Sequence, residues 1–112
     1  MSATTATNFL INLPREELER EFHALAAEWM ERGKYLSNTV QIALIPAYQR
    51  IIGLGRPVVP LILEELRREP RQWFWALEKI TGQDPVPVEA RGNVQKMADA
   101  WVAWGQQQHL IG

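Results

Sequence analysis

Few side chains in this chain are able to do chemistry, and their spacing does not assemble a catalytic site. His23 and His109 are the two imidazoles, and neither has a nucleophile or a carboxylate at an informative spacing. The chain has no Cys, which excludes disulfides, thiolate metal ligands and a Cys nucleophile. The glycine-rich motifs that bind phosphates are absent as well. We therefore expect no catalytic residue, no metal site and no cofactor.

Groups that could recognise an anion form a second, more scattered set. Tyr48, Gln49 and Arg50 offer a phenol, an amide and a guanidinium at adjacent positions, and Asp84 and Arg91 follow later in the chain. A cavity that gathered Tyr48, Arg50, Asp84 and Arg91 would be a small-ligand pocket or the site of a weak enzyme. Adjacent residues do not share a helical face, so a packed Tyr48 beside a solvated Gln49 and Arg50 is the simpler interpretation.

A small basic cluster stands at the corner between two predicted helices. Its members, Arg67, Arg68 and Arg71, could contact an acidic protein or RNA. Glutamates at 64, 65 and 69 interleave with them, which is typical of a solvated face with local ion pairs. The chain carries 12 basic and 13 acidic side chains, a net charge of −1, so it has no strong field that would attract nucleic acid.

The five Trp are the most unusual feature of the composition. Four of them, Trp29, Trp73, Trp101 and Trp104, fall on predicted apolar stripes and are expected in the core. Trp75 differs because it lies about 100° around a helix from Phe74. We expect Trp75 at the margin of the core, where an indole could line a groove or contact a partner.

The elements that must position these residues are predicted to be helices. The apolar periodicity and the placement of Pro and Gly predict helices at 14–32, 46–54, 57–68, 72–81 and 92–107, with a short helix or turn within 35–45. Pro60 predicts either a tight first turn or a later start for the third of these helices. No segment shows a convincing strand alternation. The prediction is an all-α, single compact domain of about five helices.

Length and composition agree with one domain. The 112 residues suffice to bury a core, and we expect a flexible segment at 1–12, the helical domain at 13–107 and a tail at 108–112. The start of the chain lacks a basic region followed by an apolar stretch, so we expect no secretory signal. With no Cys and no membrane-spanning run, the expected location is the cytoplasm, without contact with a membrane.

One segment resembles a known helical hairpin. The run Leu54-Gly55-x-Pro57-Val58-Val59-Pro60, followed by Trp73-Phe74-Trp75-Ala76-Leu77, resembles the hairpin of HEAT-like repeats, in which Leu-Gly precedes an Ala-Val-Pro helix start. A second copy is not visible, and a solenoid needs about three repeats. We expect a single HEAT-like hairpin within the domain.

Longer motifs resemble a family of short all-helical bacterial proteins with no assigned activity. They are Pro46-Ala47-Tyr48-Gln49-Arg50-Ile51-Ile52-Gly53-Leu54-Gly55, Trp73-Phe74-Trp75-Ala76-Leu77 with Thr81-Gly82-Gln83-Asp84-Pro85-Val86, and Ala100-Trp101-Val102-Ala103-Trp104-Gly105. The resemblance covers most of residues 20–105. Ile45 stands where that family usually has His, so a role for that imidazole is not expected here. The resemblance implies a fold and no reaction.

Together these observations favour a non-enzymatic protein–protein interaction module, such as a bacterial accessory, antitoxin or immunity-type partner. The predicted contact residues are Tyr48, Arg50, Trp75, Arg67, Arg68 and Arg71. A homodimer through the Trp101 and Trp104 helix is a further form of this hypothesis. The small-ligand module or weak enzyme is the first alternative, and nucleic-acid binding is the second.

Overall fold

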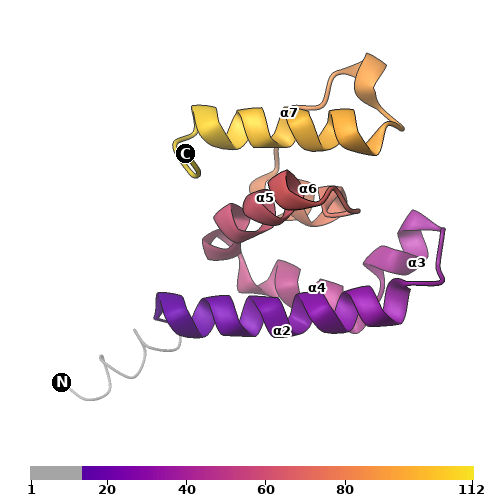
Figure 1. Cartoon of the computed structure of the whole chain (residues 1–112), viewed down its shortest axis with the longest axis vertical. Coiled ribbons are helices and arrows are strands. Elements are labelled where there is room, and N and C mark those ends of the chain that lie inside the picture. Colours follow the sequence, from indigo (N-terminus) through magenta and orange to yellow (C-terminus); the bar gives the residue numbers. More distant parts are fainter. Residues whose placement is uncertain (1–13) are drawn as a thin grey trace.

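The regular structure of the described chain is entirely helical (Figure 1). A computed structural model describes residues 14–112, and in that range the α-helices are α2 (Arg15–Gly33), α3 (Thr39–Ala43), α4 (Pro46–Leu54), α5 (Val59–Arg68), α6 (Phe74–Thr81) and α7 (Val94–Gln107). Two short 3₁₀ helices, η1 (Arg56–Val58) and η2 (Val88–Ala90), stand in the connections. This confirms the all-α prediction. The predicted flexible segment 1–12 lies outside the described residues.

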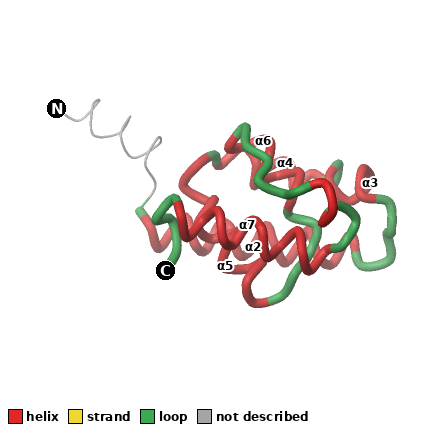
Figure 2. The backbone as a smooth tube through the Cα atoms, turned by 90° about the horizontal axis from the view of Figure 1, so that it is seen from above, coloured by secondary structure: helices red, strands yellow, loops and turns green. Residues whose placement is uncertain are grey.

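The helices stack in layers from one side of the molecule to the other (Figures 1 and 2). α2 forms one outer layer and packs on α4, and α4 packs in turn on α6. α5 contacts α6 in the middle of the stack and carries α7 on its other side. α5 and α6 are therefore consecutive helices in contact, and the HEAT-like hairpin stays a prediction.

The start of α5 shows how two prolines shape the chain. Pro57 lies in the tight turn η1, and the regular helix begins at Val59, with Pro60 in its first turn. The first N–H groups of a helix have no intrahelical acceptor, so the missing hydrogen on Pro60 costs no hydrogen bond there. Both expected effects of Pro60, a tight turn and a later start, occur together.

A cluster of aromatic rings fills the core between α2, α4 and α6. The Trp73 ring lies 4.4 Å from that of Trp29 and 5.5 Å from that of Phe22, and Tyr48 lies 5.0 Å from Trp29. These side chains and Trp101 are buried, which confirms the predicted core positions of Trp29, Trp73 and Trp101. The fourth indole, Trp104, is only partly buried and packs edge-on against Trp101 at 5.3 Å.

Residues 108–112 close the end of α7. The Leu110 N–H donates to the Gly105 carbonyl at 2.9 Å, and the His109 N–H donates to the Gln106 carbonyl at 3.1 Å. With His109 at φ 59°, this is the Schellman arrangement that terminates many helices. Arg67 also donates to the Gly112 carbonyl at 2.7 Å. The predicted tail is thus folded back onto the domain.

Candidate functional site

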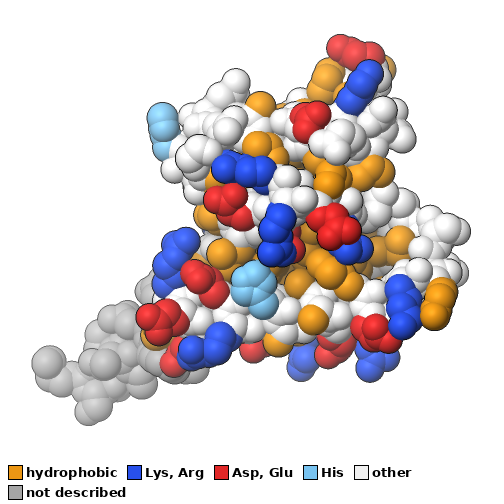
Figure 3. All heavy atoms as spheres, viewed as in Figure 1, with side chains coloured by type: hydrophobic (Ala, Val, Ile, Leu, Met, Phe, Trp, Pro, Cys, Tyr) orange, Lys and Arg blue, Asp and Glu red, His pale blue; other side chains and the backbone are white. Residues whose placement is uncertain are grey.

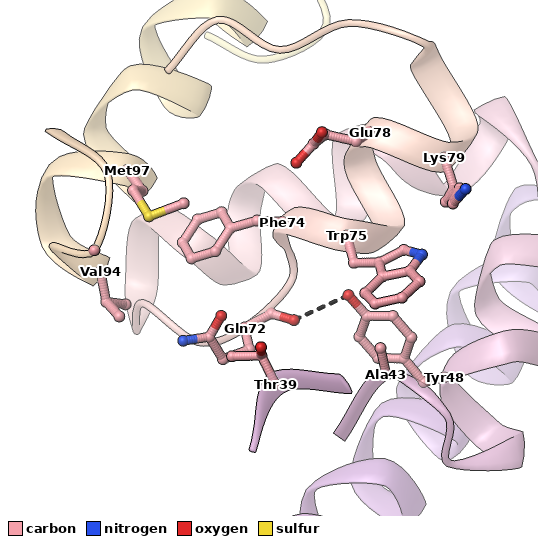
Figure 4. Close-up of a pocket in the computed structure, with 11 residues that line it drawn as sticks. Thr39, Ala43, Tyr48, Gln72, Phe74, Trp75, Glu78, Lys79, Val94 and Met97 are labelled. Carbon is pink, nitrogen blue, oxygen red and sulfur yellow. Dashed lines mark hydrogen bonds between the residues drawn. The ribbon is translucent and has the colours of Figure 1, made fainter. Parts of the chain in front are cut away.

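A cleft lies between α3, α6 and the start of α7 (Figure 4). It encloses about 460 Å³. Its lining consists of Thr39, Ala43, Tyr48, Gln72, Phe74, Trp75, Glu78, Lys79, Gly92, Val94 and Met97. Aromatic and aliphatic side chains dominate this set, and α6 supplies both of its charged groups. We call it the α6 cleft.

Trp75 forms one wall of the α6 cleft and stays accessible to solvent. Its neighbours Phe74 and Ala76 are buried, whereas Trp75 is 36% exposed, which confirms its predicted place at the margin of the core. The Lys79 ammonium lies 5.9 Å from the centre of the indole, in a cation–π contact. The indole is therefore held in place and still offers an open face.

Tyr48 lies at the back of the cleft and holds α6 in position. Its hydroxyl donates to the Gln72 carbonyl at 2.9 Å (Figure 4) and accepts the Ala76 N–H at 2.9 Å. Ala76 is in the first turn of α6, whose N–H groups need an external acceptor, and α6 has no side-chain cap of its own. Tyr48 supplies that cap from α4.

This geometry corrects the prediction that Tyr48 contacts a partner. The side chain is fully buried, and both hydrogen-bonding capacities of its hydroxyl are used inside the protein. Burial also raises the pKa of the phenol well above its ordinary value. The role of Tyr48 is to position Trp75 and its helix.

Glu78 places a carboxylate beside the apolar wall of the cleft. Glu78 is exposed overall, but the partial desolvation of its carboxylate, and after it the negative charge of Asp84, raise its pKa above the ordinary value, and the charges of Arg91 and Lys79 offset this only in part. Asp84 itself pairs with the Arg91 guanidinium and accepts the Val86 N–H at 3.2 Å. In Figure 4 the Glu78 carboxylate extends toward the side of the cleft where Met97 lies.

The structure does not assemble the predicted small-ligand pocket. Of Tyr48, Arg50, Asp84 and Arg91, only Tyr48 lines the α6 cleft. Asp84 and Arg91 satisfy each other, and Arg50 is exposed on α4. The four groups therefore do not converge on one cavity.

The basic cluster has the ion-paired structure that its sequence favours. Each arginine pairs with a neighbouring glutamate: Arg67 with Glu64 at 3.5 Å, Arg68 with Glu65, and Arg71 with Glu69 at 2.9 Å. Such exposed pairs leave little net positive potential for nucleic acid. None of the three arginines lines the α6 cleft.

A second hollow, of about 370 Å³, lies on the other side of α3. It is lined by Trp29, Met30, Gly33, Lys34, Leu36, Ile42, Pro70, Arg71, Gln72 and Val94. Gln72 and Val94 belong to both cavities. The short helix α3 therefore stands between two hollows that share part of their floor.

Exposed apolar side chains surround α3, and none of them is among the contact residues predicted from the sequence. Val40 is 48% exposed, Leu44 61% and Tyr35 90%. Val40 lies in α3 and Leu44 is its C-cap residue, and because they are four residues apart they share one face, beside the buried Ala43. The four-residue spacing of Val40 and Leu44 is the sequence signal from which this exposed apolar face could have been predicted. Figure 3 shows hydrophobic side chains gathered on the face between the α2 and α7 layers, with charges of both signs around them.

Two side chains hold α3 against the domain. The Trp29 indole donates to the Ile42 carbonyl at 3.2 Å, and the Gln49 amide donates to the Ala43 carbonyl at 2.7 Å. Asn38 caps the start of α3 by accepting two backbone N–H groups. A helix of five residues is not stable by itself, so these bonds carry much of its order.

We expect the amides of α3 to exchange with deuterium faster than those of α4 and α6. Replacing Gln49 with alanine removes one of the two anchoring bonds, worth about 1 kcal/mol, and should speed exchange in α3 about fivefold. Gln95→Ala is the matched control, because the Gln95 amide bonds Asp99 on α7. Hydrogen exchange followed by mass spectrometry measures both, and equal protection of α3 and α4 would contradict the expectation.

Membrane-spanning helices and clustered metal ligands are both absent from the described residues. No helix between Pro14 and Gly112 has both the length and the apolar character that crossing a bilayer requires. In the same range, no three His, Asp or Glu side chains gather in a way that could hold a metal ion.

Comparison with known proteins returned no matching family model, no matching curated protein and no matching solved structure. The resemblance to the short bacterial proteins therefore stays a prediction. Function has to be inferred from the geometry of the α6 cleft and the exposed groups around α3.

Proposed function

We propose that this chain is a non-enzymatic protein–protein interaction module that binds its partner over the α6 cleft and the outer face of α3. The supporting observations are a cleft with apolar walls that includes the exposed Trp75, and the exposed Val40 and Leu44 at α3, whose residues Thr39 and Ala43 line the same cleft. Large exposed apolar surface is uncommon on a monomer unless a partner covers it. A Trp at the edge of a cleft is typical of residues that dominate binding energy.

The proposal extends to the biological setting. A bacterial accessory, antitoxin or immunity-type role in the cytoplasm suits a small helical domain of balanced charge that lacks Cys. A homodimer remains one form of the interaction.

A photo-crosslinking amino acid at position 75 tests the proposal in the native host. The same group at Ala103, which is exposed on α7, serves as the control. We expect one protein to be captured at position 75 and not at position 103. Identical capture at both positions would contradict the proposal.

The purified partner then permits a quantitative test. Trp75→Ala should weaken binding at least tenfold, or about 1.4 kcal/mol, because the indole is the expected anchor. Val88→Ala removes an exposed apolar side chain outside the cleft and should leave the affinity unchanged. Circular dichroism verifies that both variants are folded, and an unchanged affinity of Trp75→Ala would remove the cleft from the interface.

A small-ligand module is the second candidate, because the volume of the α6 cleft falls within the range of ligand pockets. The polar groups that would orient such a ligand do not converge there, so this candidate has less support. A compound that raises the melting temperature of the wild type and not of Met97→Ala would favour it. Nucleic-acid binding has no comparable observation in its favour.

A further inference from the structure

We propose that the partner segment received by the α6 cleft carries an apolar side chain flanked by Lys or Arg, and that this cation pairs with Glu78. The inference depends on the proposed function, since it specifies the chemistry of the partner at the same site. It follows from two properties of the cleft, the apolar wall and the distribution of charge around it.

The apolar wall of the cleft determines which kind of side chain the partner segment places against it. Phe74, Trp75, Val94 and Met97 present aromatic, aliphatic and thioether groups to the cleft. Polar side chains of a bound segment would lose their hydration against this wall without gaining hydrogen bonds. Met and Trp also adapt well to apolar side chains of different shape. An aliphatic or aromatic side chain is therefore the occupant that the wall favours.

The charged groups around the cleft determine which charge the partner segment carries next to that apolar side chain. Arg91 is paired with Asp84, and the Lys79 ammonium lies over the Trp75 ring. Glu78 differs from these groups, because within residues 14–112 its carboxylate has no ion pair and accepts no hydrogen bond. Lys79 has no ion pair in this range either, but its ammonium contacts the Trp75 ring, so of the two charged groups that line the cleft the Glu78 carboxylate is the one without a direct contact.

The surroundings of Glu78 make a cation the favourable neighbour. Glu78 is exposed at the cleft, and the partial desolvation of its carboxylate and then the charge of Asp84 raise its pKa, an effect that the more weakly acting charges of Arg91 and Lys79 offset only in part. A Lys or Arg brought by the partner would stabilise the ionised form of Glu78. An acidic residue at the same place would be repelled by both Glu78 and Asp84, which adds specificity.

Selection from a random peptide library tests this chemistry even while the partner is unidentified. Phage-displayed peptides are panned in parallel on the wild type, on Glu78→Gln and on Trp75→Ala. We expect the wild type to enrich peptides with Lys or Arg next to an apolar residue. Glu78→Gln should keep the apolar preference and lose the basic one, and Trp75→Ala should lose both.

A double-mutant cycle measures the interaction between Glu78 and the Lys of one selected peptide directly. Glu78→Gln should weaken binding of the basic peptide about fivefold, and should leave binding of its Lys→Gln version unchanged. Glu21→Gln is the matched control, because it removes the same charge from an exposed position on α2. Fluorescence anisotropy at low and high salt measures all combinations, and the basic peptide should show the steeper salt dependence.

The outcomes separate the two proposals. Peptides that require Trp75 and show no basic preference would overturn this inference and leave the proposed function in place. If no peptide binds in a way that depends on Trp75, both are overturned. Self-association of the free chain that Glu78→Gln abolishes would also overturn the inference, in favour of a homodimer.

Discussion

Replacement of Tyr48 with phenylalanine is expected to lower the free energy of unfolding by about 2 kcal/mol. The substitution keeps the buried ring and removes only the hydroxyl. The Ala76 N–H then loses its acceptor in a buried position, and the Gln72 carbonyl loses its donor. A buried donor left without a partner costs about 1–3 kcal/mol, similar to the loss of a helix cap. Urea denaturation should show a lower midpoint at an unchanged slope.

Tyr35→Phe is the matched control for this prediction. Tyr35 is the other of the two tyrosines and is 90% exposed, so its hydroxyl can bond water in both the folded and the unfolded state. The expected change is within about 0.5 kcal/mol. Equal stability of the two variants would mean that water replaces the Tyr48 hydroxyl at the start of α6.

The same hydroxyl makes stability depend on pH in alkaline solution. The folded state raises the pKa of Tyr48 above its ordinary value of 10.0, so above that pH the unfolded chain loses a proton that the folded chain keeps. The stability contributed below pH 10 is therefore lost as the pH rises further. Tyr48→Phe should flatten this decline, whereas Tyr35→Phe should not.

Gly105→Ala is expected to lower the free energy of unfolding by up to about 2 kcal/mol, although alanine is the better helix former. A Cβ at position 105 would lie 2.5 Å from the Leu63 Cδ1 atom and 3.3 Å from Ile111. Leu63 is fully buried on α5, so it has little room to change its rotamer. The overpacking cost of about 1–3 kcal/mol exceeds the gain in helix propensity, which is about 1 kcal/mol. Thermal or urea unfolding measures the net effect.

Gly53→Ala, on α4, is expected to raise the free energy of unfolding instead of lowering it. Gly53 is exposed, and a Cβ there would meet no atom within 4 Å. Only the propensity gain remains, so stability should rise by about 0.5–1 kcal/mol. If Gly105→Ala were also stabilising, the contact between α5 and α7 would have to be looser than the structure shows.

The helices could be predicted from sequence because their signals are local. The stripe Leu18, Phe22, Leu25 and Trp29 follows the helical period, and these residues are buried on α2. The start of α4 at Pro46 and the left-handed end of α6 at Gly82 follow from the backbone preferences of proline and glycine. η2 was missed because its residues follow the Pro-rich connector at 83–87, which favours extended chain.

The candidate site was predictable only in part, because it depends on contacts between distant elements. The intermediate position of Trp75 follows from helical geometry alone. The capping role of Tyr48 requires α4 to face the start of α6, a contact 28 positions along the chain that no local pattern reports. The lone carboxylate of Glu78 likewise becomes evident only when Arg91 is found on Asp84. The capping role of Tyr48 and the lone carboxylate of Glu78 both depend on contacts between residues that are distant in the sequence.

The order of the layers has a consequence for how quickly the chain can reach this structure. α2 packs on α4, α4 on α6 and α5 on α7, so the two helices of each of these pairs are separated by a single α-helix along the chain. The entropy cost of closing a loop grows only slowly with its length, and helical folds with local contacts are among the fastest to form. The outer layers, α2 and α7, lie on opposite sides of the stack (Figure 1). Each stage of folding can therefore add a helix to its near neighbour, and none has to wait for the two ends of the domain to meet.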